Sequence, residues 1–224
     1  SRYGLDLYGE RKLAELLRQL CRIDGLVWIR VHYLYPDEMS QELIDVLANE
    51  PKIVKYLDIP IQHINDDILR RMNRRGTGEE IRALFKKLRE RIPGLVLRTS
   101  LITGLPYEDE AAFEELCQFL QDVHIERAGV FPYSPEEGTP AAKMDDPVPR
   151  SEKQVWFDRL CDTQNEISAR LHAAYVGRTV RVLVDGTTDD SRWPLSARTN
   201  GGRLVHLAGD PSVIGTYQNV TVTD

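Results

Sequence analysis

Hydrophobic positions in the first 150 residues switch repeatedly between a helical spacing and short apolar runs. Leu13, Leu16, Leu17 and Leu20 recur at the spacing of one helix face, and Gly25 ends this pattern before the apolar run 26–33. Helical patterns follow at 37–50, 65–72, 77–92 and 109–123, and apolar runs at 56–62, 95–104 and 127–134. Helices of about 12 residues between β-branched runs predict βαβ units and a parallel sheet.

The four apolar runs predict an α/β fold of a particular kind. Four strands are too few to close an eight-stranded barrel, but they fit a partial parallel (β/α) barrel. The pattern changes after Pro149: residues 150–175 read as one long helix, and short β-runs separated by turn residues follow from Gly177. We expect a partial barrel over 1–150, a connecting helix over 151–176, and a small all-β, OB-like barrel over 177–224.

Charge and apolar content narrow the classes of function. The chain has 29 Lys and Arg against 35 Asp and Glu, a net charge of −6, so a strongly basic RNA-coating protein is excluded. No apolar run approaches the ~18 residues of a membrane span, and no secretory signal pattern is visible at the start, so a cytoplasmic protein is the default expectation. The 177–224 segment has five arginines and five aspartates, which favours RNA binding only if the arginines gather on one face.

The three cysteines give no metal-binding pattern. Cys21, Cys117 and Cys161 stand far apart, without the spacing of a CxxC site or of a disulfide framework. We expect plain buried or half-buried thiols.

Polar residues stand where three predicted strands end, namely at Gln62 and His63, at Thr103 and Gly104, and at Tyr133 and Ser134. Ligands of open parallel sheets bind at the carboxyl ends of the strands, so these residues are candidates for a site. Strand alternation predicts that Gln62 points into the barrel while Leu57, Ile59 and Ile61 face the helices. The alternative for Gln62 and His63 is a capping role toward the helix at 65–72.

Arg98 and a cluster of four arginines each have two alternative interpretations. Arg98 lies on a strand, where burial requires an anion: either the carboxylate of a bound cofactor or a core-facing carboxylate in a structural salt bridge. Arg70, Arg71, Arg74 and Arg75 form either a nucleic-acid stripe or a solvated helix end.

Several motifs in order resemble a known family: "SRYGLDLYGERKLAELLRQL", "YLDIPIQHINDDILRRMNRRGT", "LRTSLITGLP" and "FPYSPEEGTPAA". They are similar to the methylthiotransferase branch of the radical SAM enzymes, and the β-rich tail resembles its TRAM domain. "DIPIQH" and "YSPEEGT" resemble the members that add a methylthio group to an aspartate of a small-subunit ribosomal protein. "ARTNGGRLVHLAGDPSVIG" is closer to the tRNA-modifying members. A tRNA methylthiotransferase and a cluster-free ribosome- or RNA-binding module therefore remain alternatives.

The resemblance also implies cofactors and partners. The family uses S-adenosylmethionine and two 4Fe-4S clusters, and the cluster cysteines are absent from this sequence, so we expect the chain to begin downstream of both sets and to be inactive by itself. The expected partners are a small-subunit ribosomal protein as substrate and RNA contacted through TRAM, with no membrane. The implied cofactor-binding residues are Gln62, Arg98, Ser100, Ile102 and Gly104, and the implied substrate-binding residues are His63 and Tyr133.

Overall fold

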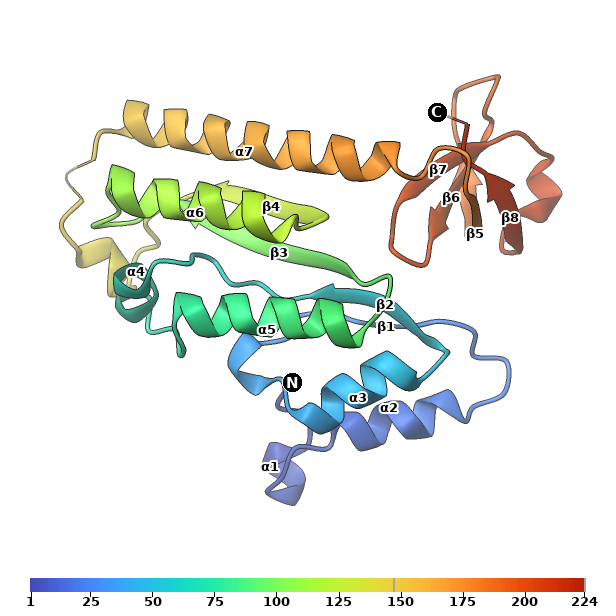
Figure 1. Cartoon of the computed structure of the whole chain (residues 1–224), viewed down its shortest axis with the longest axis horizontal. Coiled ribbons are helices and arrows are strands. Elements are labelled where there is room, and N and C mark those ends of the chain that lie inside the picture. The colour runs from blue at the N-terminus through green and yellow to red at the C-terminus, as the bar shows by residue number, and fades with distance from the viewer. Residues whose placement is uncertain (147, 224) are drawn as a thin grey trace.

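Two four-stranded sheets, joined by a long helix, make up the chain (Figure 1). The computed structural model describes residues 1–146 and 148–223, so Asp224, counted above in the charge of the tail, lies outside the described residues. The first sheet has the order β1-β2-β3-β4, with every neighbouring pair parallel. Its strands are β1 (Ile29–Val31), β2 (Ile53–Asp58), β3 (Val96–Thr103) and β4 (Arg127–Pro132). The predicted α/β class with a partial parallel barrel is confirmed.

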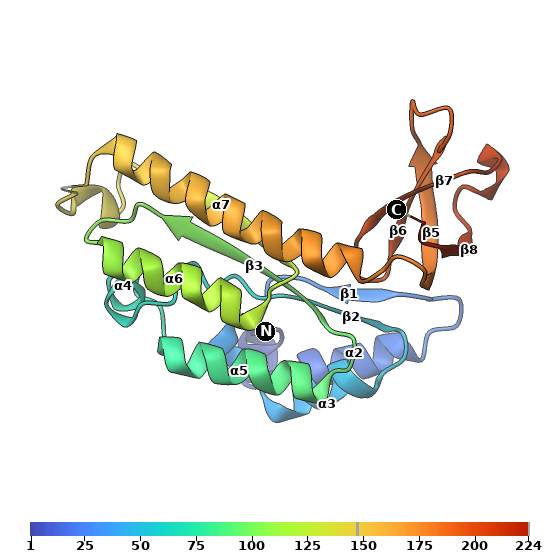
Figure 2. The ribbon, with the colours of Figure 1, turned by 45° about the horizontal axis from the view of Figure 1, so that its top comes forward.

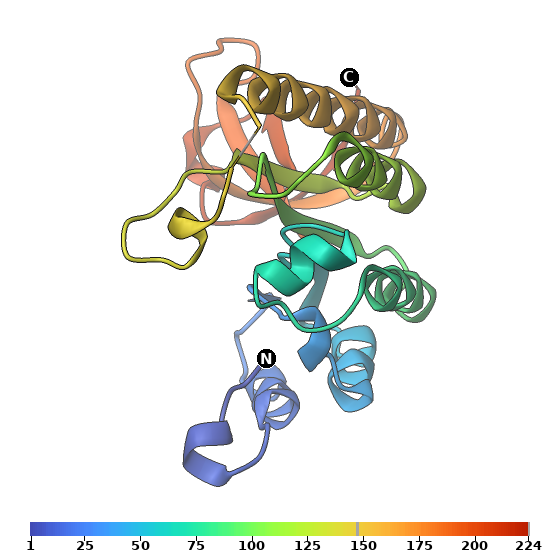
Figure 3. The same ribbon diagram turned by 90° about the vertical axis from the view of Figure 1, so that its left-hand side faces the viewer.

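Helices cover one face of this sheet. Seen end-on, α3, α5 and α6 follow one another around one side of it (Figure 3). The helices of this part are α1 (Leu5–Tyr8), α2 (Leu13–Cys21), α3 (Gln41–Asn49), α4 (Asp66–Arg71), α5 (Gly78–Arg91) and α6 (Glu110–Val123), with 3₁₀ turns η1 (Pro36–Glu38) and η2 (Ala141–Lys143). Alternation along β3 puts Leu97 and Leu101 into the core beneath the helices. The opposite face, here called the inner face, carries Arg98, Ser100 and Ile102.

Short polar residues cap the starts of α4 and α5. Thr77 and Glu80 form a reciprocal cap on α5: Thr77 Oγ1 accepts from Glu80 N at 3.2 Å, and Glu80 Oε2 accepts from Thr77 N at 2.8 Å. Asn65 caps α4 by accepting from Asp67 N at 3.1 Å. These caps fix the points at which the chain leaves each strand-end loop.

Helix α7 (Arg150–Ala173) crosses from the first sheet to the second and also packs on the first (Figures 1 and 2). Its Trp156, Leu160 and Ile167 are buried in the core of the parallel sheet, and the Trp156 ring stacks on Phe113 of α6 at 5.4 Å between centroids. The helix therefore belongs to the packing of the barrel as well as connecting the two parts.

The second sheet is antiparallel, with the order β7-β6-β5-β8. Its strands are β5 (Thr179–Thr187), β6 (Leu195–Thr199), β7 (Leu204–Leu207) and β8 (Tyr217–Thr221), and η3 (Pro211–Val213) precedes β8. Val182, Val184, Leu195, Ala197 and Leu207 form a separate small core. The predicted small all-β unit is confirmed.

The two parts touch near the amino ends of the parallel strands. The rings of Trp28 and Tyr217 meet edge to face with centroids 4.8 Å apart, and Arg30 Nη2 donates to Asn200 O at 2.9 Å. The carboxyl ends of the strands, where the predicted site residues other than Arg98 lie, are at the other edge of the sheet.

Two strand boundaries differ from the prediction. The run 56–62 was expected to be one strand, but β2 spans 53–58, because Pro60 has no N–H to donate and Gln62 has φ 71°. Gln62 forms only an isolated parallel bridge with Leu101. The run 26–33 is a strand only over 29–31, and Tyr33 also has a positive φ of 56°.

The cysteines are free thiols, as expected: Cys117 is buried, and Cys21 and Cys161 are half-buried. Within the described residues, no helix is long and apolar enough to cross a membrane.

Candidate functional site

The inner face presents a row of aligned polar and aromatic residues. Arg98 pairs in register with Asp58 of β2 and with Arg127 of β4, and Ile102 pairs with Phe131. Residues in register on parallel strands point to the same side, so these side chains share the inner face. Four of the five predicted cofactor-binding residues lie along it: Gln62, Arg98, Ser100 and Ile102.

A buried carboxylate organises the middle of this face. The Asp58 side chain is 2% exposed, and Arg98 Nη1 donates to both of its oxygens at 2.8 Å. His32 Nδ1 lies 3.6 Å from the second Asp58 oxygen. Burial acts to lower the pKa of Arg98, but the hydrogen bonds and charge of Asp58 outweigh it, so the pKa is raised. Of the two interpretations of Arg98, the structure shows the salt bridge, made to a buried carboxylate on the inner face.

Gln62 and Ser100 line one small pocket on the inner face. The backbone of Gln62 is fixed on β3, since its N donates to Ser100 O at 2.9 Å and its O accepts from Ile102 N at 2.8 Å. The pocket has a volume of about 170 Å³, and its other lining residues are Tyr33, Leu34, Tyr35, Pro60 and Arg74. Gln62 thus points to the inner side as predicted, while Leu57, Ile59 and Ile61 are buried in the core.

The chemistry of this pocket fits part of a nucleoside-type cofactor. It combines an amide, a hydroxyl and aromatic side chains, which provide hydrogen bonds and flat apolar contact. Pockets for whole drug-sized ligands have volumes of roughly 300–1,000 Å³. The described residues alone could therefore hold only a portion of S-adenosylmethionine here.

His63 does not lie at this pocket. Its side chain is fully buried, its Nδ1 accepts from Asn65 N at 3.0 Å, and its Nε2 lies 3.2 Å from Glu108 Oε1. Because Nδ1 accepts, Nε2 carries the hydrogen that is donated to Glu108. Glu108 also accepts from Leu105 N at 2.9 Å. His63 joins two strand-end loops and supports the start of α4, so its expected contact with a substrate is replaced by a structural role.

A side chain of the protein packs against Gly104. It has φ 77°, and a Cβ at this position would lie 2.8 Å from Cδ of Lys153 on α7. The expected close approach is present, but its partner is the Lys153 stem. A cofactor contact at Gly104 stays a prediction and would be made by its backbone, because Lys153 fills the side on which a Cβ would lie.

Tyr133 lies beyond β4 in a different hollow, of about 500 Å³. Its hydroxyl is buried without a hydrogen-bond partner among the described residues, and Lys153 Nζ is 5.5 Å from its ring centroid. Burial, and secondarily the charge of Asp146, raises the pKa of Tyr133. Lys153 Nζ donates to Asp146 at 2.5 Å. Tyr133 and Gln62 thus line two different hollows.

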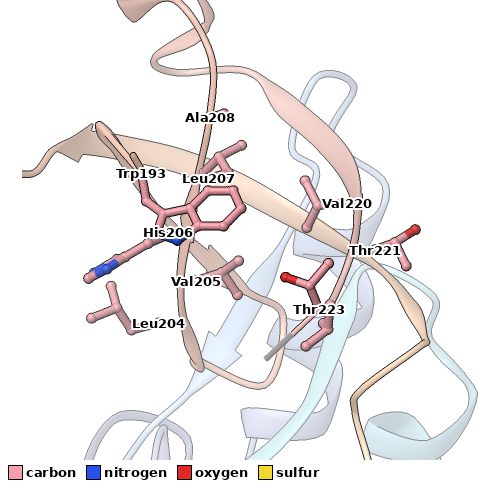
Figure 4. Close-up of a pocket in the computed structure, with 10 residues that line it drawn as sticks. Trp193, Leu204, Val205, His206, Leu207, Ala208, Val220, Thr221 and Thr223 are labelled. Atoms are coloured by element: carbon pink, nitrogen blue, oxygen red, sulfur yellow. The ribbon is translucent and has the colours of Figure 1, made fainter. Parts of the chain in front are cut away.

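A larger hollow, of about 730 Å³, lies in the second sheet between its edge strands β7 and β8 (Figure 4). Trp193, Leu207 and Val205 lie on one side and Val220 on the other. It contains none of the predicted site residues, and its lining has one titratable side chain, His206.

The arginines around α4 make local contacts. Arg70 pairs with Asp67 at 2.8 Å, the Arg71 guanidinium stacks 4.0 Å from the centroid of Tyr107, and Arg74 Nη1 donates to Pro60 O at 3.5 Å. These contacts support the solvated helix end rather than a nucleic-acid stripe.

Iron–sulfur ligation does not fit the described residues. Across residues 1–146 and 148–223 there is no group of three or more His, Cys, Asp or Glu that could hold a metal ion. Burial raises the pKa of the Cys117 thiol to about 11, which disfavours the thiolate that iron requires.

Sequence reasoning missed the polar neighbours of the predicted residues. Asp58, His32 and Tyr33 all contribute to the inner face. Asp58 had one usable signal, since an aspartate inside an apolar strand of a parallel sheet needs a buried partner. Tyr33 had none, because its position follows from a positive φ.

Comparisons with known proteins agree with this architecture. The model of the Radical SAM superfamily matches residues 5–120, which is more than half of the chain. The chain belongs to the radical SAM superfamily. The model of the TRAM domain matches residues 173–224 of this radical SAM chain, which include the whole antiparallel sheet.

Curated relatives are similar over almost all of the chain. The ribosomal protein uS12 methylthiotransferase RimO of Lachnoclostridium phytofermentans is 46% identical over 227 residues, covering 99% of this chain and 52% of the relative. The proteins of the same name from Anaeromyxobacter sp. strain K and Geobacter sulfurreducens are 48% and 42% identical, covering 97% and 99% of this chain and 45% and 51% of the relatives. The chain thus spans about half the length of these relatives.

Among solved structures, the radical SAM chain is similar to coproporphyrinogen III oxidase (HemN) from Escherichia coli, described as a radical SAM enzyme. The TM-score is 0.53 at 21% identity, covering 87% of this chain and 44% of that one. This likeness concerns the fold alone.

Proposed function

We propose that the chain is part of a radical SAM methylthiotransferase that modifies an aspartate of ribosomal protein uS12. The observation that carries this proposal is the identity of 42–48% over 97–99% of the chain to proteins named as uS12 methylthiotransferases. Membership of the radical SAM superfamily supports the reaction class. A ribosomal substrate would place the reaction in the cytoplasm.

The inner face supplies this chain's contribution to cofactor binding. Gln62 and Ser100 offer polar contacts beside aromatic rings, and Ile102 lies on the same face next to them. S-adenosylmethionine, when bound with a 4Fe-4S cluster, supplies the radical chemistry of the family. The described residues do not fit the clusters, so the role of this chain is to bind and orient. Asp58 positions Arg98 by accepting hydrogen bonds from its Nη1, and the rest of the Arg98 guanidinium also lies on the inner face.

Substrate and RNA contacts belong to two further surfaces. Tyr133, beside Lys153 at the carboxyl end of β4, has a hydroxyl without a hydrogen-bond partner among the described residues and is a candidate contact for the protein substrate. The TRAM domain is a candidate RNA contact, since Arg181 stacks on Tyr217 at 4.4 Å and Arg192 on Trp193 at 5.0 Å. Arginine and aromatic side chains together suit RNA recognition through phosphates and stacked bases.

The experiment compares two substrate classes with one enzyme. The full-length parent, reconstituted with iron and sulfide without oxygen, is incubated with S-adenosylmethionine and either uS12, small ribosomal subunits or tRNA. Mass spectrometry is expected to find a methylthio group on one aspartate of uS12 and none on tRNA. The matched control is uS12 with that aspartate changed to asparagine. Modification of tRNA alone would replace the proposal by the tRNA methylthiotransferase.

A further inference from the structure

Three arginines meet where the TRAM domain contacts the parallel sheet, and we call Arg30, Arg127 and Arg203 the junction arginines. They come from β1, β4 and the β6–β7 turn. Gly202 in that turn is buried against two of them: a Cβ there would lie 3.3 Å from Arg30 Nη1 and 3.6 Å from Arg127 Nη1. A side chain at 202 would thus occupy the space beside both guanidinium groups.

Arg203 is the most deeply placed of the three. It is 8% exposed, and its guanidinium lies 4.5 Å from the centroid of the Tyr175 ring. Its Nε and Nη1 are buried without any hydrogen-bond partner among the described residues. Burial, and secondarily the charge of Arg127, lowers the pKa of Arg203. An unpartnered buried guanidinium is costly, so it indicates a missing acceptor.

The nearby carboxylates do not supply that acceptor. Among the described residues, none of the junction arginines forms an ion pair. Glu126 precedes Arg127, but it is already bound by Arg89 at 3.0 and 3.2 Å and by Leu97 N at 2.8 Å. The contacts of Arg30 are with neutral groups: it donates to Asn200 O, and its guanidinium lies 4.7 Å from the centroid of the Tyr56 ring.

The adjacent arginines are paired, in contrast. Arg98 has Asp58 at 2.8 Å, and Arg198 has Asp185 at 2.9 Å. Burial is the main cause that lowers the pKa of Arg127, and its charged neighbours Arg198, Arg30 and Arg98 add to this effect. The junction therefore concentrates positive charge that the described part of the chain does not neutralise.

We propose that the junction arginines form a binding site for a phosphate-type oxyanion between the inner face and the β6–β7 turn of the TRAM domain. Guanidinium groups bind phosphate oxygens with paired N–H donors, and three of them match a multiply charged anion better than a single carboxylate. The glycines at 201 and 202 leave the turn without side chains beside the site. The site is distinct from the Gln62 pocket and does not depend on the proposed methylthiotransferase activity.

The test measures binding of inorganic pyrophosphate to the 224-residue chain by titration calorimetry at constant ionic strength in chloride. The wild type is expected to bind saturably, and Arg127→Gln is expected to weaken Kd by about tenfold or more, since it removes charge-assisted hydrogen bonds. Arg18→Gln, which changes a solvent-accessible arginine of α2 paired with Glu42, is the matched control and is expected to leave Kd unchanged.

A second measurement guards against misfolding and identifies the source of the phosphate. Without phosphate, Arg127→Gln is expected to unfold at the same or a higher urea concentration than the wild type, because it removes a repelling charge. Competition by a short oligouridylate would assign a phosphodiester of RNA as the ligand, and its failure to compete would assign a free phosphate compound. No saturable binding of pyrophosphate, or equal binding by the folded Arg127→Gln variant, would overturn the proposal.

Discussion

The Asp58–Arg98 ion pair gives a quantitative test of how the inner face is built. In Asp58→Asn, the carboxylate becomes an amide with one acceptor oxygen, and its new NH₂ group faces Arg98. Two hydrogen bonds of 2.8 Å from Arg98 Nη1 depend on that carboxylate. We therefore expect the substitution to destabilise the fold through the loss of the pair.

The magnitude follows from the burial of the two partners. Removing one partner of a buried ion pair costs roughly 3–5 kcal/mol, and hydrogen bonds to charged groups contribute about 1.5–3 kcal/mol. Asp58 is 2% exposed but Arg98 is 30% exposed, so water can partly solvate the guanidinium left behind. We expect the free energy of unfolding to fall by about 2–3 kcal/mol.

Urea unfolding followed by circular dichroism measures this change. The matched control is Asp45→Asn, which breaks an exposed pair with Arg91 at 2.7 Å and should lower the free energy of unfolding far less, because water screens that pair. The double variant with Arg98→Gln should show a coupling energy of at least about 1 kcal/mol. If Asp58→Asn costs no more than Asp45→Asn, or if the two single effects simply add, the pair does not organise the inner face.

The remaining predictions concern a thiol and a glycine. Burial raises the pKa of Cys117 from its ordinary 9.0 to about 11, so the unfolded chain loses this proton first and the folded state loses stability as pH rises from 9 to 11. Urea midpoints measured at about pH 8 and about pH 10.5 should therefore fall more in the wild type than in Cys117→Ala, and an equal fall would contradict the assignment. At Gly78, an added Cβ would lie 2.2 Å from Ile64 O, so Gly78→Ala should lower the free energy of unfolding by about 1–3 kcal/mol, and an unchanged urea midpoint would refute this packing.

The sequence predicted most elements because local periodicity decides them. The apolar spacing placed the helices at 77–92 and 109–123 within a residue of α5 and α6. The early end of β2 was less visible. Pro60 indicates that a strand ends, but nothing in the sequence indicates the positive φ of Gln62.

The site residues were harder to place because distant segments decide their surroundings. His63 is held by Glu108, 45 residues further along the chain, and Gly104 is covered by Lys153 of α7. Neither neighbour can be inferred from spacing within a strand. Ser100 and Ile102 could be placed by the alternation along β3, and Gln62 by its parity with Asp58 along the run 56–62.

The cofactor-binding role of the inner face is tested most directly by the affinity of the full-length parent for S-adenosylmethionine, with and without Gln62→Ala. The side chain of Gln62 lines the pocket while its backbone is held on β3, so the variant should remain folded. We expect Kd from titration calorimetry to weaken by roughly tenfold, the effect of about one polar contact, while Gln218→Ala in the TRAM domain leaves it unchanged. An unchanged Kd in a folded Gln62→Ala parent would contradict the account.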